Sequence, residues 1–127
     1  MKTSKILGLA VILSLAPIPV LAETPVGEIG YSKGSLGYDA LMAGQNDMAL
    51  AQLEAARDVD ADDPARLINL GQAYARVGRT GDAARMFIAA MQSKRSFDLL
   101  LANGEVMNSR DAARMAFDNL NDRIASR

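Results

Sequence analysis

Residues 64–92 read PARLINLGQAYARVGRTGDAARMFIAAMQ, and their special positions already occur 34 residues earlier in the chain. Leu70-Gly71 repeats Leu36-Gly37, and Gly78 repeats Gly44. The other pairs with this separation are Ala40 with Tyr74, Ala49 with Ala83, Leu53 with Phe87, and Ala56 with Ala90. A period of this length is typical of stacked helical hairpins. The sequence therefore predicts two copies of one hairpin side by side, which favours a binding surface over an active site.

The spacing of apolar residues predicts six helices and no evident strands. Ala49, Leu53 and Ala56 recur every three or four residues, as on one face of a helix. Gly44 and Gly78 are good helix ends because glycine accepts a left-handed backbone. The expected helices span residues 32–43, 46–57, 65–77, 81–92, 97–102 and 110–124. The last unit is irregular, because residues 111–115 repeat residues 82–86 (DAARM) after 29 positions instead of 34.

The first 22 residues have the pattern of a secretory signal peptide. A short basic start is followed by an uncharged apolar run over residues 6–16, and Pro17 and Pro19 then interrupt it. Small residues at Val20 and Ala22 fit a cleavage site after Ala22. The alternative is an uncleaved membrane anchor, but about 20 apolar residues are needed to span a bilayer. We therefore expect an exported protein, periplasmic or secreted, that is not stably inserted in a membrane.

Composition narrows the class of function. Removal of 22 of the 127 residues would leave 105, and without Lys2 and Lys5 the 14 basic residues become 12 against 15 acidic ones. This suits one small domain, after a flexible lead-in over residues 23–30. There is no basic surplus to bind phosphates, so nucleic acid is not an expected partner. The chain has no cysteine and no histidine, which removes the usual nucleophile and the usual general base. No enzymatic activity and no cofactor are expected.

An acidic connector lies between the two best repeats. Asp58, Asp60, Asp62 and Asp63 resemble the start of a calcium-binding loop. That loop also needs a glycine at its sharp turn and a glutamate at its end, and this chain has Asp63 and Asn69 there. We therefore expect a solvated connector and no metal site, with an ion sensor as the weaker alternative.

The repeated residues resemble the tetratricopeptide repeat (TPR) family. The resemblance is strongest over residues 64–95, through Leu70, Gly71, Tyr74, Gly78, Ala83, Phe87 and Ala90. Residues 30–63 match through Leu36, Gly37, Gly44, Ala49, Leu53 and Ala56, and residues 96–127 match mainly around Ala112. The family's late proline is absent, with Arg95 in its place. The resemblance implies an all-α, right-handed superhelical stack of about three hairpins over residues 31–127, the third degenerate.

The resemblance also implies a concave groove that binds a peptide. In this family the first helix of each pair lines the groove. The matching positions are Tyr38, Leu41, Met42, Ala65, Asn69, Gln72 and Arg76. Aromatic, methionine, amide and guanidinium groups could hold an extended segment or a helix of a partner. An alternative is that Tyr38, Leu41 and Met42 pack against the N-terminal segment or each other, and that the polar positions are only a solvated face.

We therefore expect an adaptor or assembly factor of the cell envelope, with another protein or peptide segment as its partner. Similar exported proteins serve secretion, pilus or outer-membrane assembly systems, which is a family-level association. The alternative is a spacer protein that self-associates through its ends.

Overall fold

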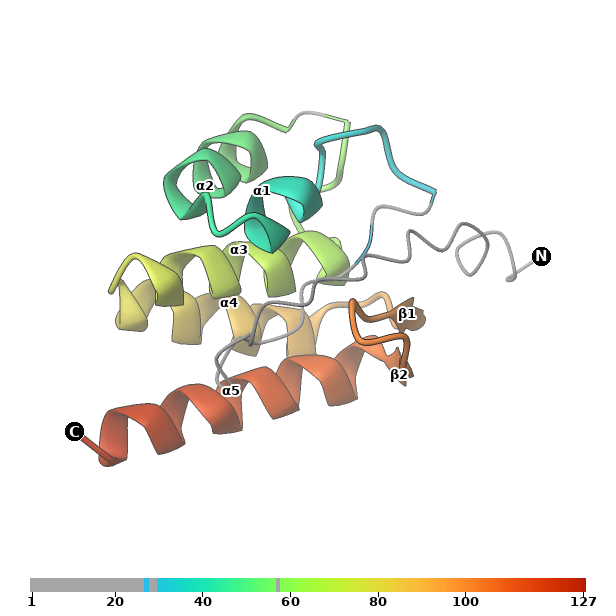
Figure 1. Ribbon diagram of the computed structural model, residues 1–127. Coiled ribbons are helices and arrows are strands. Elements are labelled where there is room, and N and C mark those ends of the chain that lie inside the picture. Colours follow the sequence, from blue (N-terminus) through green and yellow to red (C-terminus); the bar gives the residue numbers. More distant parts are fainter. Residues whose placement is uncertain (1–26, 28–29, 57) are drawn as a thin grey trace.

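The computed structural model describes residues 27, 30–56 and 58–127. The expected signal peptide and most of the expected lead-in therefore lie outside the described residues. The described chain is mostly helical and also contains one small antiparallel sheet (Figure 1). Its elements are α1 (Tyr38–Met42), α2 (Asn46–Ala55), α3 (Pro64–Arg76), α4 (Thr80–Gln92), β1 (Asp98–Leu100), β2 (Val106–Asn108) and α5 (Ser109–Ala125).

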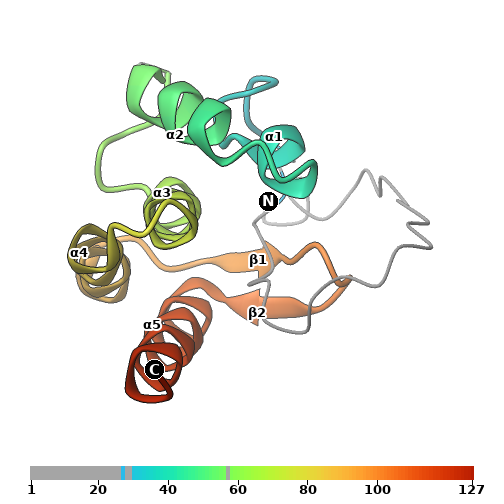
Figure 2. The same ribbon diagram turned by 60° about the vertical axis from the view of Figure 1, so that its left-hand side comes forward.

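The helices lie in three layers. Figure 1 shows α1 and α2 above α3 and α4, with α5 below. In the turned view of Figure 2, α3 lies between α2 and α4, and the β1–β2 hairpin lies beside α3. The most extensive contacts join α3 to α4 and α4 to α5. Helix α3 is therefore the central element, and its burial explains why most of its side chains are apolar or hydrogen-bonded.

The same turn ends α1 and α3. Gly44 and Gly78 have φ angles of 72° and 86°. After Gly44, the Gln45 amide donates to the Ala40 carbonyl at 2.8 Å, and after Gly78 the Arg79 amide donates to the Tyr74 carbonyl at 2.9 Å. Each bond satisfies a carbonyl that the helix end would leave without a partner. The two turns therefore share their hydrogen bonds at a separation of 34 residues.

A second repeated contact joins each first helix region to the helix that follows it. A Cβ placed on Gly71 would lie 2.5 Å from a ring carbon of Phe87. A Cβ placed on Gly37 would lie 3.3 Å from Leu53, which is 34 residues before Phe87. Both large side chains are fully buried. The missing side chains at the two glycines therefore allow the helices to approach closely.

The apolar core runs through all three layers. Leu36, Ile68, Ala90, Leu99 and Ala113 belong to one buried cluster that joins the chain before α1 to α3, α4, β1 and α5. Smaller clusters fill the space between α1, α2 and α3, and between α4 and α5. The hairpin is therefore part of the core, since Leu99 packs inside it.

The prediction of a helix over residues 97–102 is wrong, and with it the prediction of six helices without strands. Residues 98–100 form β1, which pairs with β2 so that Leu99 lies opposite Met107. Asn103 and Gly104, the latter with a φ of 86°, form the turn. Six residues are too few to sustain an isolated helix, and alternating burial of Leu99 and Leu101 suits a strand.

The expected helix over residues 32–43 is much shorter in the structure. Helix α1 begins only at Tyr38, because Gly34 and Gly37 have φ angles of 85° and 61°. The Ser35 amide donates to the Ser32 carbonyl at 3.0 Å, and the Gly37 amide donates to the Gly34 carbonyl at 3.1 Å. Two successive turns therefore replace the first half of the expected helix.

We expect Gly71→Ala to destabilise the fold. The new methyl group would meet the buried Phe87 ring, and overpacking of this kind costs about 2 kcal/mol even against the gain in helix propensity. Gly81→Ala is the matched control, because nothing lies within 4 Å of its added Cβ and its helix should gain up to about 0.5 kcal/mol. Urea unfolding of both variants measures the difference. Equal effects would show that the α3–α4 contact tolerates a side chain at position 71.

Candidate functional site

The structure places the six expected groove residues in two groups. Leu41, Asn69 and Gln72 are buried, whereas Tyr38, Met42 and Arg76 are partly exposed. The Asn69 amide group donates to the Leu36 carbonyl at 3.0 Å, across the gap between α3 and the chain before α1. Leu41, Asn69 and Gln72 are thus inside the protein and not at a surface that a partner could touch. Ala65, the further groove position, is also fully buried.

Arg76 acts on the end of α1. Its Nη1 atom donates to the Leu41 carbonyl at 2.7 Å. The last carbonyls of a helix have no partner within the helix, and a cation there is also favoured by the helix dipole. At least part of the guanidinium therefore fastens α1 to α3.

Tyr38 meets the N-terminal part of the chain. A Cβ placed on Gly27 would lie 3.9 Å from a Tyr38 ring carbon and 3.8 Å from the Leu100 carbonyl oxygen. The Gly27 amide donates to that oxygen at 3.3 Å. The contact favours the alternative in which Tyr38 packs against the N-terminal segment.

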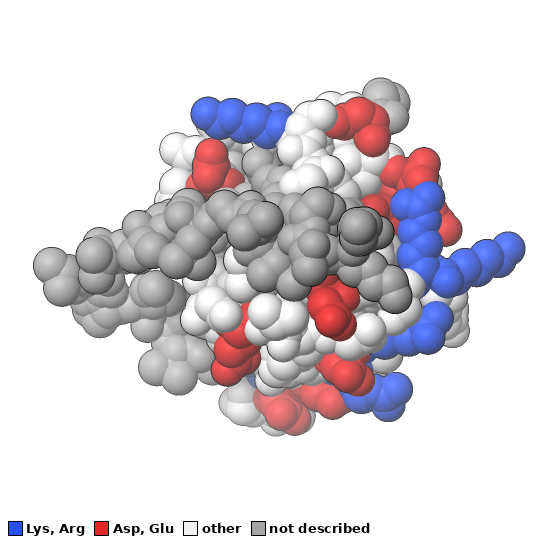
Figure 3. All heavy atoms as spheres, turned by 90° about the vertical axis from the view of Figure 1, so that its right-hand side faces the viewer, with Lys and Arg blue, Asp and Glu red and all other residues white. Residues whose placement is uncertain are grey.

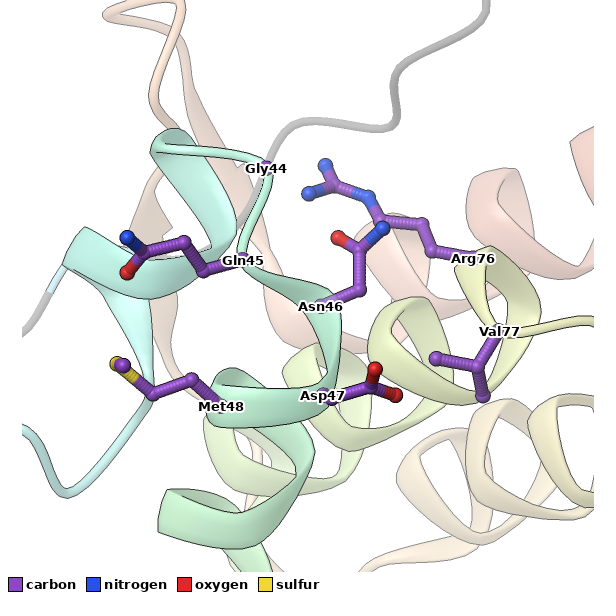
Figure 4. Close-up of a pocket in the computed structure, with 7 residues that line it drawn as sticks. All are labelled: Gly44, Gln45, Asn46, Asp47, Met48, Arg76 and Val77. Carbon is purple, nitrogen blue, oxygen red and sulfur yellow. The ribbon is translucent and has the colours of Figure 1, made fainter.

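A shallow hollow of about 520 Å³ opens beside Arg76, where the turn between α1 and α2 meets the end of α3. Figure 4 shows its lining, with the polar ends of Asn46 and Arg76 near each other, while Gln45 and Met48 point away from them. The lining residues are Gly44, Gln45, Asn46, Asp47, Met48, Arg76 and Val77. Arg76 alone is shared with the expected groove.

The chemistry of this hollow suits a polar main chain better than an apolar ligand. The Asn46 Oδ1 atom is buried and accepts no hydrogen bond from the described part of the chain. Such an acceptor favours an N–H donor from outside. Met48 is 51% exposed and adds a flexible apolar contact at the rim. The sequence carried a weak signal for Met48, because it falls off the apolar face formed by Ala49 and Leu53.

The acidic connector is engaged by protein groups. Asp63 is buried and caps α3, accepting from the Ala65 amide at 2.9 Å. Asp60 pairs with Arg95, and Asp58 accepts from the Ser35 hydroxyl at 2.8 Å. Within the described ranges, no group of three acidic residues could hold a metal ion. The carboxylates therefore position the α2–α3 connection and the chain that precedes α1.

Tyr31 is fastened to the same connector. Its hydroxyl donates to the Asp63 carboxylate, with both oxygen atoms at 3.1 Å. Burial raises the pKa of the Tyr31 phenol well above its ordinary value, and the neighbouring Asp63 charge raises it further. The phenol therefore stays protonated and remains a donor to Asp63 throughout the neutral range.

No protein-family model, curated protein or solved structure matches this chain. Figure 3 shows acidic side chains scattered over one face, with basic side chains mostly near its right-hand edge. None of the described helices is long and apolar enough to cross a bilayer.

We expect Tyr31→Phe to lower the free energy of unfolding by about 1.5 kcal/mol at pH 7, because it removes a hydrogen bond to a charged group. The raised pKa gives this difference a pH dependence. It should be constant below about pH 10, the unfolded value, and shrink as the pH rises above it, since only the unfolded phenol then ionises. Urea unfolding of both proteins between pH 7 and 11 measures it. A difference that grows with pH would contradict the assigned contact.

Proposed function

We propose that the chain is a TPR-like repeat protein that binds another protein and has no catalytic role. In this proposal α1–α2 and α3–α4 are two repeat units of a right-handed superhelical stack, and the β1–β2 hairpin with α5 is a degenerate third. Two observations support it. The helix-ending turns at Gly44 and Gly78 share their hydrogen bonds, and the contacts of Gly37 with Leu53 and of Gly71 with Phe87 are equivalent.

The hollow beside Arg76 is the best-supported place for a partner to bind. It differs from the expected concave groove, whose Asn69 and Gln72 are buried. The buried Asn46 Oδ1 atom carries this proposal, because a peptide N–H would supply the donor it lacks among the described residues. The partner we infer is an extended polypeptide segment whose main chain reaches Asn46 and whose apolar side chain covers Met48.

The proposal includes export, with a signal peptide removed after Ala22 and work as an adaptor or assembly factor in the cell envelope. Its support is the sequence pattern of residues 1–22 alone. We expect the protein isolated from the producing cells to begin at Glu23. N-terminal sequencing measures this directly, and a start at Met1 would contradict cleavage.

Self-association as a spacer is the second candidate. It is favoured by the exposed apolar side chains of Ile88, Met115 and Ile124, which lie on the last two helices and are 37%, 39% and 47% exposed. Apolar groups at one end of a stack could pair with a second copy. Light scattering separates the two candidates, because a monomer at micromolar concentration would exclude the spacer.

We expect a photo-reactive amino acid placed at Met48 to crosslink a second polypeptide in the producing cells. Met48 is 51% exposed, so the replacement should not disturb the core. Asp118, which is exposed on α5, is the matched control and should give no adduct of the same mass. Gel electrophoresis and mass spectrometry of the adducts measure the result.

Three results would overturn the assignment of this surface. They are the absence of any adduct from Met48, the same adduct from both positions, and an adduct with twice the mass of the chain. The last would instead support self-association.

A further inference from the structure

The backbone of β1 has an inward and an outward side. The Leu101 amide donates to the Glu105 carbonyl at 2.8 Å, and the Ser109 amide donates to the Phe97 carbonyl at 2.9 Å. Residues 97 and 101 thus direct their hydrogen-bonding groups toward the second half of the hairpin. Because backbone groups alternate along a strand, those of Asp98 and Leu100 point away from β2. The outer edge of β1 therefore presents main-chain donors and acceptors.

Gly27 binds this outer edge. Its amide donates to the Leu100 carbonyl at 3.3 Å, and the Tyr38 ring lies on its other side. We propose that the outer edge of β1 is a strand-addition site for extended polypeptide, and that the chain's own N-terminal arm occupies it through Gly27. The chemistry that this site recognises is a main-chain N–H and not a particular side chain.

The space around Gly27 supports recognition through the main chain. An added Cβ would make ordinary contacts at 3.8 Å with the Leu100 oxygen and at 3.9 Å with Tyr38. Glycine is therefore not required for room, and alanine fits the same place. Loss of the N–H group, by contrast, would remove the bond that defines the site.

The arm has a second attachment close by, which favours this chain over a free segment as the occupant. Four residues after Gly27, the Tyr31 hydroxyl is bound to Asp63. A tether this short gives the arm an effective concentration on the order of millimolar at the β1 edge. A two-stranded sheet is also only marginally stable by itself, so an added segment stabilises it.

Occupation of this edge has a consequence for Tyr38. One side of the ring is engaged by Gly27, so any other segment that reaches this position must first displace the arm. The inference is independent of the hollow beside Arg76, because it can be tested with the chain alone and no partner.

The test compares Gly27→Pro, which has no N–H group, with Gly27→Ala, which keeps it. The protein is used as isolated from the producing cells. In the native chain we expect the Gly27 amide to exchange at least about tenfold more slowly than an unstructured amide. In Gly27→Pro the Tyr38 ring protons should become more accessible to a dissolved paramagnetic agent, whereas Gly27→Ala should match the native chain. Both readouts come from nuclear magnetic resonance and do not depend on any activity.

A peptide with the sequence ETPVGEIG, residues 23–30, provides the second arm of the test. Added at millimolar concentration to Gly27→Pro, it should shift the Leu100 and Tyr38 signals toward their native positions, and the same peptide with proline for its first glycine should not. The proposal is overturned by an unprotected Gly27 amide, by equal effects of the two variants, or by a peptide without effect. If mixed isotope labelling shows the contact between two copies, the assignment to the chain's own arm is wrong.

Discussion

The close approach of α3 and α4 at Gly71 is the contact on which the other layers depend. The Phe87 ring fills the space that a side chain at Gly71 would take. The same ring belongs to the buried cluster that holds Ala116 and Leu120 of α5. One aromatic side chain thus connects the middle and lower layers. The equivalent contact of Gly37 with Leu53 joins α2 to the chain before α1, and the smaller leucine suits the smaller upper layer.

The sequence predicts α2, α3, α4 and α5 to within two residues at each end, because their signals are local. Apolar spacing marks their buried faces, and Gly78 stops α3 where its φ angle becomes positive. The errors occur where local signals compete. Gly34 and Gly37 divide the expected first helix. The run Leu99–Leu101 fits a buried strand as well as a helix, and its partner Met107 is specified only by the folded chain.

The candidate site was less predictable than the fold. The helical period identifies which side chains of α3 share a face, but it does not specify what covers that face. Asn69 has the polarity of a groove residue, yet the chain around Leu36 lies over it and accepts its hydrogen bond. The hollow beside Arg76 depends on how the α1–α2 turn meets the end of α3. Residues 30 positions apart build it, so no local pattern specifies it.

These polar contacts have a common physical origin in the shortness of α1. A helix of five residues is not stable by itself. Two α3 side chains compensate, because Asn69 holds the carbonyl that precedes α1 and Arg76 holds a carbonyl near its end. Groups that a longer first helix would leave facing outward are therefore consumed in holding a short one. This argues that a partner binds at the edge of the upper layer, around Asn46 and Met48, where polar and apolar groups still reach the surface.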